Sequence, residues 1–85
     1  MSMFLNSFEF TTEDITTILR AHQSDISINE LVEISDALDF DSIARTALMF
    51  DSNEDQLQAA LSHAEDLMIM DGLYITEPKR FYVDD

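Results

Sequence analysis

Residues 53–72 read NEDQLQAALSHAEDLMIMDG, and they carry the longest helical pattern in the chain. Apolar residues recur there at the three- and four-residue spacing that places them on one face of an α-helix. Gly72 stands where a left-handed C-cap would end the helix, so we predict a helix over about Asn53–Asp71. The residues expected to face inward are Leu57, Ala60, Leu61, Ala64, Leu67 and Met68. Those expected to face outward include Glu54, Asp55, Gln58, Ser62, Glu65 and Asp66.

Three shorter helices are predicted before this one, over about Thr12–His22, Ile28–Leu38 and Ser42–Phe50. Capping patterns support the first two and the long helix, because a Ser or Thr is followed three residues later by an acid at Thr11, Ser27 and Ser52. The residues expected to be buried are Ile15, Ile18, Leu19 and His22 in the first helix, and Ile28, Leu31, Val32, Ser35 and Leu38 in the second. In the third, apolar residues surround most of the helix, namely Ile43, Ala44, Ala47, Leu48 and Phe50.

The pattern changes after Gly72. Leu73–Thr76 and Arg80–Val83 are rich in β-branched and aromatic residues, and a short segment with Pro78 separates them. This arrangement is typical of a β-hairpin. Alternation within Met3–Phe10 is compatible with a third strand against that hairpin. The sequence therefore predicts one α+β domain over residues 1–85, mainly helical, with three to four helices followed by a C-terminal β-hairpin.

The order of these elements resembles a winged-helix domain. The residues that carry the resemblance are Ser27-Ile28-Asn29-Glu30-Leu31, Leu67-Met68-Ile69-Met70-Asp71-Gly72-Leu73 and Phe81-Tyr82-Val83. It implies that the step Asp71-Gly72-Leu73 enters the wing. The chain departs from the family by the extra helical segment Ser42–Phe50 and by acids on the long helix, where DNA-reading members present basic or amide side chains to base edges. The resemblance thus implies a winged-helix-like fold without its usual DNA-binding function.

The charge excludes several partners. The 85 residues include 18 acidic and 4 basic residues, for a formal net charge of -14. Direct binding to nucleic acid is not expected, because it normally requires several Lys or Arg against the phosphates, and anionic lipid would also repel the chain. No apolar run is long enough to predict a membrane span. Zero cysteines and the lack of a signal-peptide pattern favour a reducing, cytoplasmic location.

No motif predicts catalysis, a metal or a cofactor. The segment Asp51–Asp55 begins like a calcium loop, but Gln56 stands where the loop needs Gly, and Ser62 stands where it needs a bidentate Glu. We interpret the segment as an acidic helix N-terminus. His22 and His63 have no partner at a metal-ligand spacing, so we expect His22 to be a satisfied residue beneath the first helix and His63 to lie at the surface. A nucleophile elbow and a phosphate loop are both absent from the sequence, so we expect no enzymatic activity and no cofactor.

The acidic residues are concentrated in the middle of the chain. Residues 25–71 contain 12 acids and one base, Arg45. Like charges at helical spacing destabilise a helix, so a role other than stability is the hypothesis. These acids would imitate the phosphate rows of a nucleic acid and block the basic groove of a DNA- or RNA-binding protein. The residues proposed to bind this partner are Glu30, Glu33, Asp36, Asp39, Asp41, Asp51, Glu54, Asp55, Glu65 and Asp66.

In its small size, acidity and lack of cysteine, the chain is similar to the inhibitors that bacteriophages aim at host restriction enzymes, CRISPR complexes or transcription factors. Two alternatives stay open. The acids can form a solvated surface that keeps the protein soluble. The chain can also be an adaptor or homo-oligomer, including a homodimer, that binds through apolar surface. The residues of this second patch are Ile69, Met70, Leu73, Phe81, Phe4 and Phe8, unless the hairpin and the N-terminal strand cover them.

Overall fold

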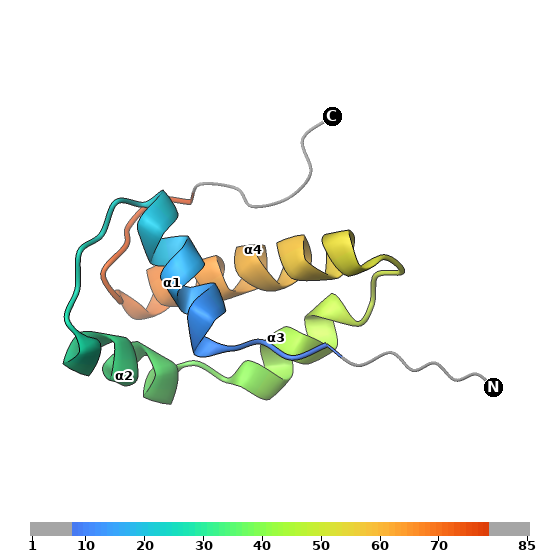
Figure 1. Cartoon of the computed structure of the whole chain (residues 1–85), viewed down its shortest axis with the longest axis horizontal. Helices are drawn as coiled ribbons and strands as arrows, with labels where there is room; N and C mark the ends of the chain where they lie inside the picture. The colour runs from blue at the N-terminus through green and yellow to red at the C-terminus, as the bar shows by residue number, and fades with distance from the viewer. Residues whose placement is uncertain (1–7, 79–85) are drawn as a thin grey trace.

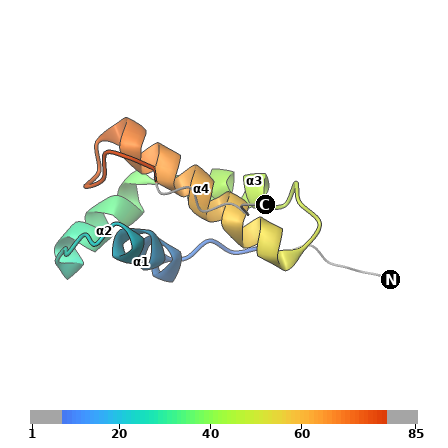
Figure 2. The ribbon, with the colours of Figure 1, turned by 90° about the horizontal axis from the view of Figure 1, so that it is seen from above.

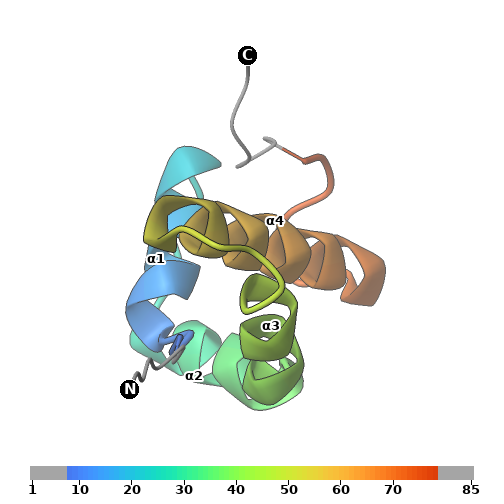
Figure 3. The ribbon, with the colours of Figure 1, turned by 90° about the vertical axis from the view of Figure 1, so that its right-hand side faces the viewer.

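The computed structural model describes residues 8–78, and they form four α-helices. Helix α1 spans Thr12–Ala21, α2 spans Ile28–Ala37, α3 spans Phe40–Ala47 and α4 spans Asn53–Asp71. In Figure 1, α2 and α3 follow one another along the lower side, and α4 returns above them in the opposite direction. Figure 2 shows α1 crossing beside α4. Seen from the end in Figure 3, α1, α4 and the α2–α3 pair lie on three sides of the core.

Local hydrogen bonds define where the helices begin. The Ser27 hydroxyl accepts from the backbone N–H of Glu30 at 3.2 Å, and the Glu30 carboxylate accepts from the Ser27 N–H at 2.8 Å. This is the reciprocal capping box that the sequence predicts. Ser52 caps α4 by a single hydrogen bond, accepted from the N–H of Asp55 at 3.1 Å. Helix α3 begins earlier than predicted because Asp39 acts as its N-cap and accepts from the N–H of Ser42 at 3.2 Å.

The core is built from apolar side chains of all four helices. Ile15 and Ile18 of α1, Ile34 of α2, Ile43 of α3 and Met68 of α4 are fully buried together. Helix α4 packs most extensively against α3, and α1 contacts both α2 and α4. Because α4 packs against both α3 and α1, it carries the longest apolar pattern in the sequence.

The α+β prediction is wrong, because residues 8–78 contain no strand. Gly72 is the left-handed C-cap that we expected, with φ 69°, but Leu73–Thr76 is irregular rather than extended. Tyr74 adopts φ 71°, which interrupts an extended conformation three residues after the helix ends. Ile75 is buried in the core. The β-branched pattern of Leu73–Thr76 therefore reflects a segment held in place by the burial of Ile75, not a strand. The first strand of the wing, which a winged-helix-like order requires, is absent from the described residues.

The other predicted strands lie wholly or mostly outside the described residues. Arg80–Val83, the second strand of the predicted hairpin, lies entirely outside them. Of the predicted strand Met3–Phe10, only residues 8–10 are described, and they are irregular. Phe10 is buried and packs edge-to-face on Phe40, with ring centroids 5.1 Å apart. An aromatic contact thus holds this segment where a strand was expected.

Two helices present a different face from the one predicted. In α2, Ile28 is 79% exposed and Val32 is 51% exposed, whereas Ile34 is fully buried. The inward face of α2 is therefore rotated towards Ile34 and Leu38. In α4, Leu57 is exposed and its neighbour Gln56 is buried instead. The Gln56 side-chain amide donates to the backbone carbonyl of Phe50 at 3.0 Å, which satisfies a carbonyl in the turn before α4.

The third helix is also more exposed at its end than predicted. Its helical residues stop at Ala47, and Leu48 is the C-cap. Ile43 and Ala47 are buried as expected, Ala44 and Leu48 are half-buried, and Phe50 is exposed in the turn that follows. The prediction that apolar residues around most of this helix are buried is therefore correct for Ile43 and Ala47 but not for Phe50.

Candidate functional site

The ten predicted partner-binding acids lie on α2, on α3, in the turn between α3 and α4, and on α4. Eight of them are exposed, while Glu30 is half-buried and Glu65 is buried. The exposed ones are Glu33, Asp36, Asp39, Asp41, Asp51, Glu54, Asp55 and Asp66. Most of the set is thus accessible to a partner, over elements that adjoin one another in Figure 1.

Several of these acids have a local structural role. The carboxylates of Glu30 and Asp39 accept backbone N–H groups at the starts of α2 and α3. Asp41 lies in the first turn of α3, and Glu54 and Asp55 lie in the first turn of α4. Negative charge is favourable at these positions because the helix dipole is positive there. Helix capping therefore accounts for part of the acidic content without any partner.

The acids at every third position of α2 wind around the helix. At 3.6 residues per turn, Glu30, Glu33 and Asp36 are each displaced by about 60° from the previous one. The Glu33 carboxylate accepts a hydrogen bond from the Tyr74 hydroxyl at 2.7 Å. That hydrogen bond, together with the nearby charge of Glu33, raises the pKa of Tyr74 to about 12. Asp36 has no such partner among the described residues.

Glu65 does not belong to the acidic surface. Its side chain is 1% exposed, and its Oε2 lies 2.6 Å from Nε2 of His22, whose side chain is 8% exposed. The pair joins the C-cap of α1 to the middle of α4 across the core. The prediction that Glu65 faces outward is therefore wrong, whereas the interpretation of His22 as a satisfied residue beneath the first helix is consistent with this contact. Sequence spacing contained the signal, because Leu61, Glu65 and Met68 occupy positions i, i+4 and i+7 of the buried face.

The surface carboxylates are not neutralised by basic side chains within residues 8–78. Sixteen acids fall in this range, against only Arg20 and Arg45, and both arginines are exposed. Over those residues, neither arginine lies within 4.0 Å of a carboxylate oxygen. A negative field of this kind extends about 8 Å into a solution of physiological salt. The arrangement can attract a cationic surface before contact.

The structure places no obvious metal centre in the described part of the chain. There, no three His, Cys, Asp or Glu side chains converge at a metal-binding distance. The segment that begins like a calcium loop forms the N-terminus of α4 instead, with Ser52 as its cap. His63 is half-buried beside the α3–α4 interface rather than fully at the surface.

The predicted apolar patch is only partly present. Ile69, Leu73 and Phe8 are half-buried and pack against the core, whereas Met70 is 79% exposed. Phe4 and Phe81 lie outside the described residues. Other exposed apolar side chains were missed, namely Ile28, Val32, Met49, Phe50 and Leu57. Those on α2 were missed because we expected the whole apolar stripe of that helix to be buried.

Searches against protein-family models, characterised proteins and solved structures find no match for this chain. Between residues 8 and 78, none of the helices combines the length and the apolar character that a bilayer crossing requires. A functional assignment therefore depends on the side chains described above.

Proposed function

We propose that this protein is a non-enzymatic inhibitor that binds the basic groove of a DNA- or RNA-binding protein in place of nucleic acid. The observation that carries the proposal is the exposed, uncompensated negative charge on α2, α3 and α4. A groove lined with Lys and Arg captures such a surface rapidly, because complementary charge mainly increases the association rate. Glu65 is excluded from the binding set because it is buried against His22.

Substitution of three carboxylates tests the proposed binding surface most directly. Asp36, Asp41 and Asp66 are exposed, belong to the proposed set and make no hydrogen bond within the described chain. The triple variant D36N/D41N/D66N removes three charges with almost no change in shape. Its matched control is E9Q/D71N/E77Q, which removes three charges that are also exposed but lie outside the proposed set. The two variants have the same net charge, so they separate a local surface from overall acidity.

The assay uses the immobilised full-length chain and proteins from a cell lysate that bind a duplex-DNA column. We expect these proteins to bind the wild-type chain and to be released by free duplex DNA and by moderate salt. Their affinity should fall about tenfold for D36N/D41N/D66N, which corresponds to 1.4 kcal/mol, and should change little for the control. Equal loss in both variants, or release by salt but never by DNA, would contradict nucleic-acid mimicry.

A second candidate is an adaptor or homo-oligomer that binds through apolar surface. The exposure of Met70 and of Met49, at 79% and 80%, favours it. Association by this route depends little on salt, because burial of apolar area rather than charge drives it. Met70→Lys should then convert a sedimenting dimer or complex into a monomer while D36N/D41N/D66N has no effect. A chain that sediments as a monomer with and without Met70→Lys would leave this candidate without support.

A further inference from the structure

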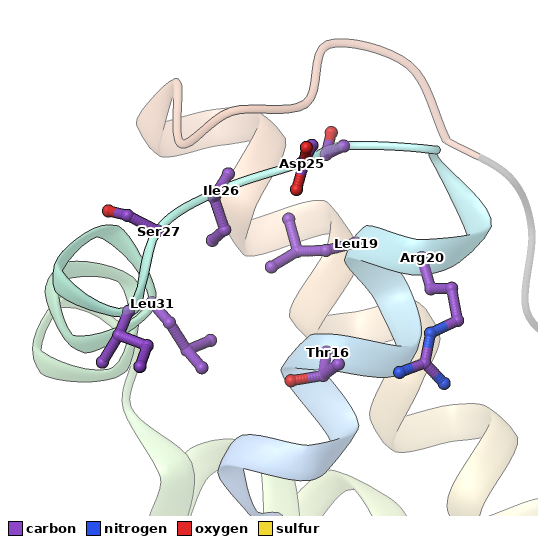
Figure 4. Close-up of a pocket in the computed structure, with 9 residues that line it drawn as sticks. Thr16, Leu19, Arg20, Asp25, Ile26, Ser27 and Leu31 are labelled. Atoms are coloured by element: carbon purple, nitrogen blue, oxygen red, sulfur yellow. The ribbon is translucent and has the colours of Figure 1, made fainter.

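A groove between α1 and α2 joins exposed apolar surface to the acidic surface. Leu19 of α1, Ile26 of the connecting segment and Ile28 and Leu31 of α2 line it, with Thr16 and Asp25 at its edges. Figure 4 shows Thr16 and Leu19 on one side and Leu31 on the other, with Ile26 above them. The side chain of Arg20 also borders the groove but extends along α1 rather than towards α2.

The size of the groove limits what it can hold. Its volume is about 250 Å³, which is smaller than the pockets that usually enclose a cofactor or a drug-sized ligand. A cavity of about 150 Å³ accommodates benzene, so this groove has room for one aromatic or branched aliphatic side chain. The groove therefore fits a side chain of a partner better than a free small molecule.

The charges beside the groove indicate which partner would present that side chain. Ile28, Val32 and Asp36 are spaced by four residues, so they form one stripe on the surface of α2. Ile28 and Val32 are exposed, and Asp36 follows one turn later. Asp25 lines the groove itself, whereas Asp36 lies outside the lining, about 12 Å along α2 from Ile28. A second copy of this chain would bring another net charge of -14 to the same place, which disfavours self-association here.

We propose that the α1–α2 groove receives an apolar side chain from a basic segment of the target protein, whose Lys or Arg residues pair with Asp25 and Asp36. This inference rests on the proposed function and adds to it an apolar anchor. Charge complementarity brings the basic segment to the surface, and burial of the anchor against Ile28 and Leu31 slows its release. The anchor gives selectivity for segments that combine positive charge with a large apolar residue.

The test compares two synthetic peptides of equal positive charge, one made of Leu and Lys and the other of Lys with Ser. Binding to the full-length chain is followed by amide NMR shifts and by titration. We expect the Leu–Lys peptide to shift the amides of Leu19, Ile26, Ile28 and Leu31 and to bind about tenfold more tightly than the Lys–Ser peptide. The variant I28Q/V32Q should remove this preference, because both side chains are exposed and their replacement leaves the core intact. Met49→Gln should not change this preference, because Met49 is as exposed as Ile28 but lies in the turn between α3 and α4, away from the groove.

Five results would overturn the proposal. Equal binding of both peptides, or no effect of I28Q/V32Q, would show salt-dependent attraction without an anchor, and the proposed function would stand alone. Binding that ignores both salt and D36N/D41N/D66N would instead contradict the proposed function itself. A free dimer that I28Q/V32Q dissociates would make a second copy the occupant. Groove amides that shift in K79Q/R80Q without peptide would make the chain's own C-terminal residues the occupant.

Discussion

At the scale of the residue, three positions within residues 8–78 have a positive φ: Gln23 at 56°, Gly72 at 69° and Tyr74 at 71°. Such a conformation costs about 1–2 kcal/mol for a residue with a Cβ atom, and Gly avoids that cost. Nothing lies within 4 Å of a Cβ added at Gly72, so a substitution there tests backbone strain alone. Gln23 is exposed and its side chain makes no hydrogen bond within residues 8–78.

We predict that substitutions at Gly72 and Gln23 change the free energy of unfolding in opposite directions. Gly72→Ala should lower the free energy of unfolding by about 1 kcal/mol, because Ala must adopt the left-handed conformation. Gln23→Gly should raise it by about 0.5–1 kcal/mol, after the greater freedom of Gly in the unfolded chain is subtracted. Urea denaturation with an unchanged slope measures both effects. A neutral Gly72→Ala would show that the C-cap can relax.

We predict that the Tyr74 hydroxyl titrates at a higher pH than an ordinary tyrosine. Its pKa is raised from 10.0 to about 12, first by the hydrogen bond to Glu33 and then by burial and by the charges of Glu33 and Glu30. The folded pKa exceeds the unfolded value, so this contribution to stability is complete below pH 10 and is lost as the pH rises through 12. In a Tyr82→Phe background, tyrosinate absorbance should report one transition near pH 12. Glu33→Gln should return it towards 10, whereas Asp36→Asn, which removes the same charge from the same helix, should leave it high.

At the scale of the element, the contact of His22 with Glu65 fixes α1 against α4. Removing one partner of a buried, hydrogen-bonded ionisable pair costs about 3–5 kcal/mol, so Glu65→Ala should cause a large loss of stability. Asp66→Ala is the control, because the next residue on α4 is exposed and its substitution should change stability by less than about 0.5 kcal/mol. Thermal and urea unfolding measure both variants. Glu65→Gln keeps a hydrogen-bonding side chain and serves if Glu65→Ala does not fold. Equal effects of the Glu65 and Asp66 substitutions would contradict the structural role of the pair.

The same elements show what the sequence could and could not predict. The bounds of α4 were predicted correctly, because both are set locally. Ser52 caps the start of the helix by a hydrogen bond, and Gly72 ends it by its left-handed φ. The face of α2 was predicted wrongly, because packing against α1 and the shared core selected Ile34 over Ile28. Periodicity cannot decide between such adjacent faces when both are apolar. Glu65 was predicted to face outward because it is an acid, although its spacing from Leu61 and Met68 places it on the buried stripe. The His22 partner that satisfies it there lies 43 residues away in the sequence.

At the scale of the whole molecule, the net charge of -14 makes salt act in opposite directions on folding and on binding. Within residues 8–78 no Arg–carboxylate pair exists for salt to weaken, so screening should mainly relieve repulsion among the acids. Adding NaCl should therefore raise the free energy of unfolding, by about 1 kcal/mol if several helix neighbours each contribute a few tenths. D36N/D41N/D66N has less repulsion to relieve, so it should gain less. Unfolding curves at rising NaCl measure this gain, and a loss of stability would reveal attractive pairs.

This dependence strengthens the binding experiment. A complex held by charge should dissociate over the same range of NaCl in which the free chain becomes more stable. Dissociation that accompanies a rising midpoint of unfolding therefore cannot be attributed to unfolding of the inhibitor. The two curves, measured on one sample of full-length chain, would separate loss of electrostatic contact from loss of fold. A complex that persists in NaCl high enough to stabilise the free chain would instead be held by apolar contacts, and the acidic surface would then serve helix capping and solubility.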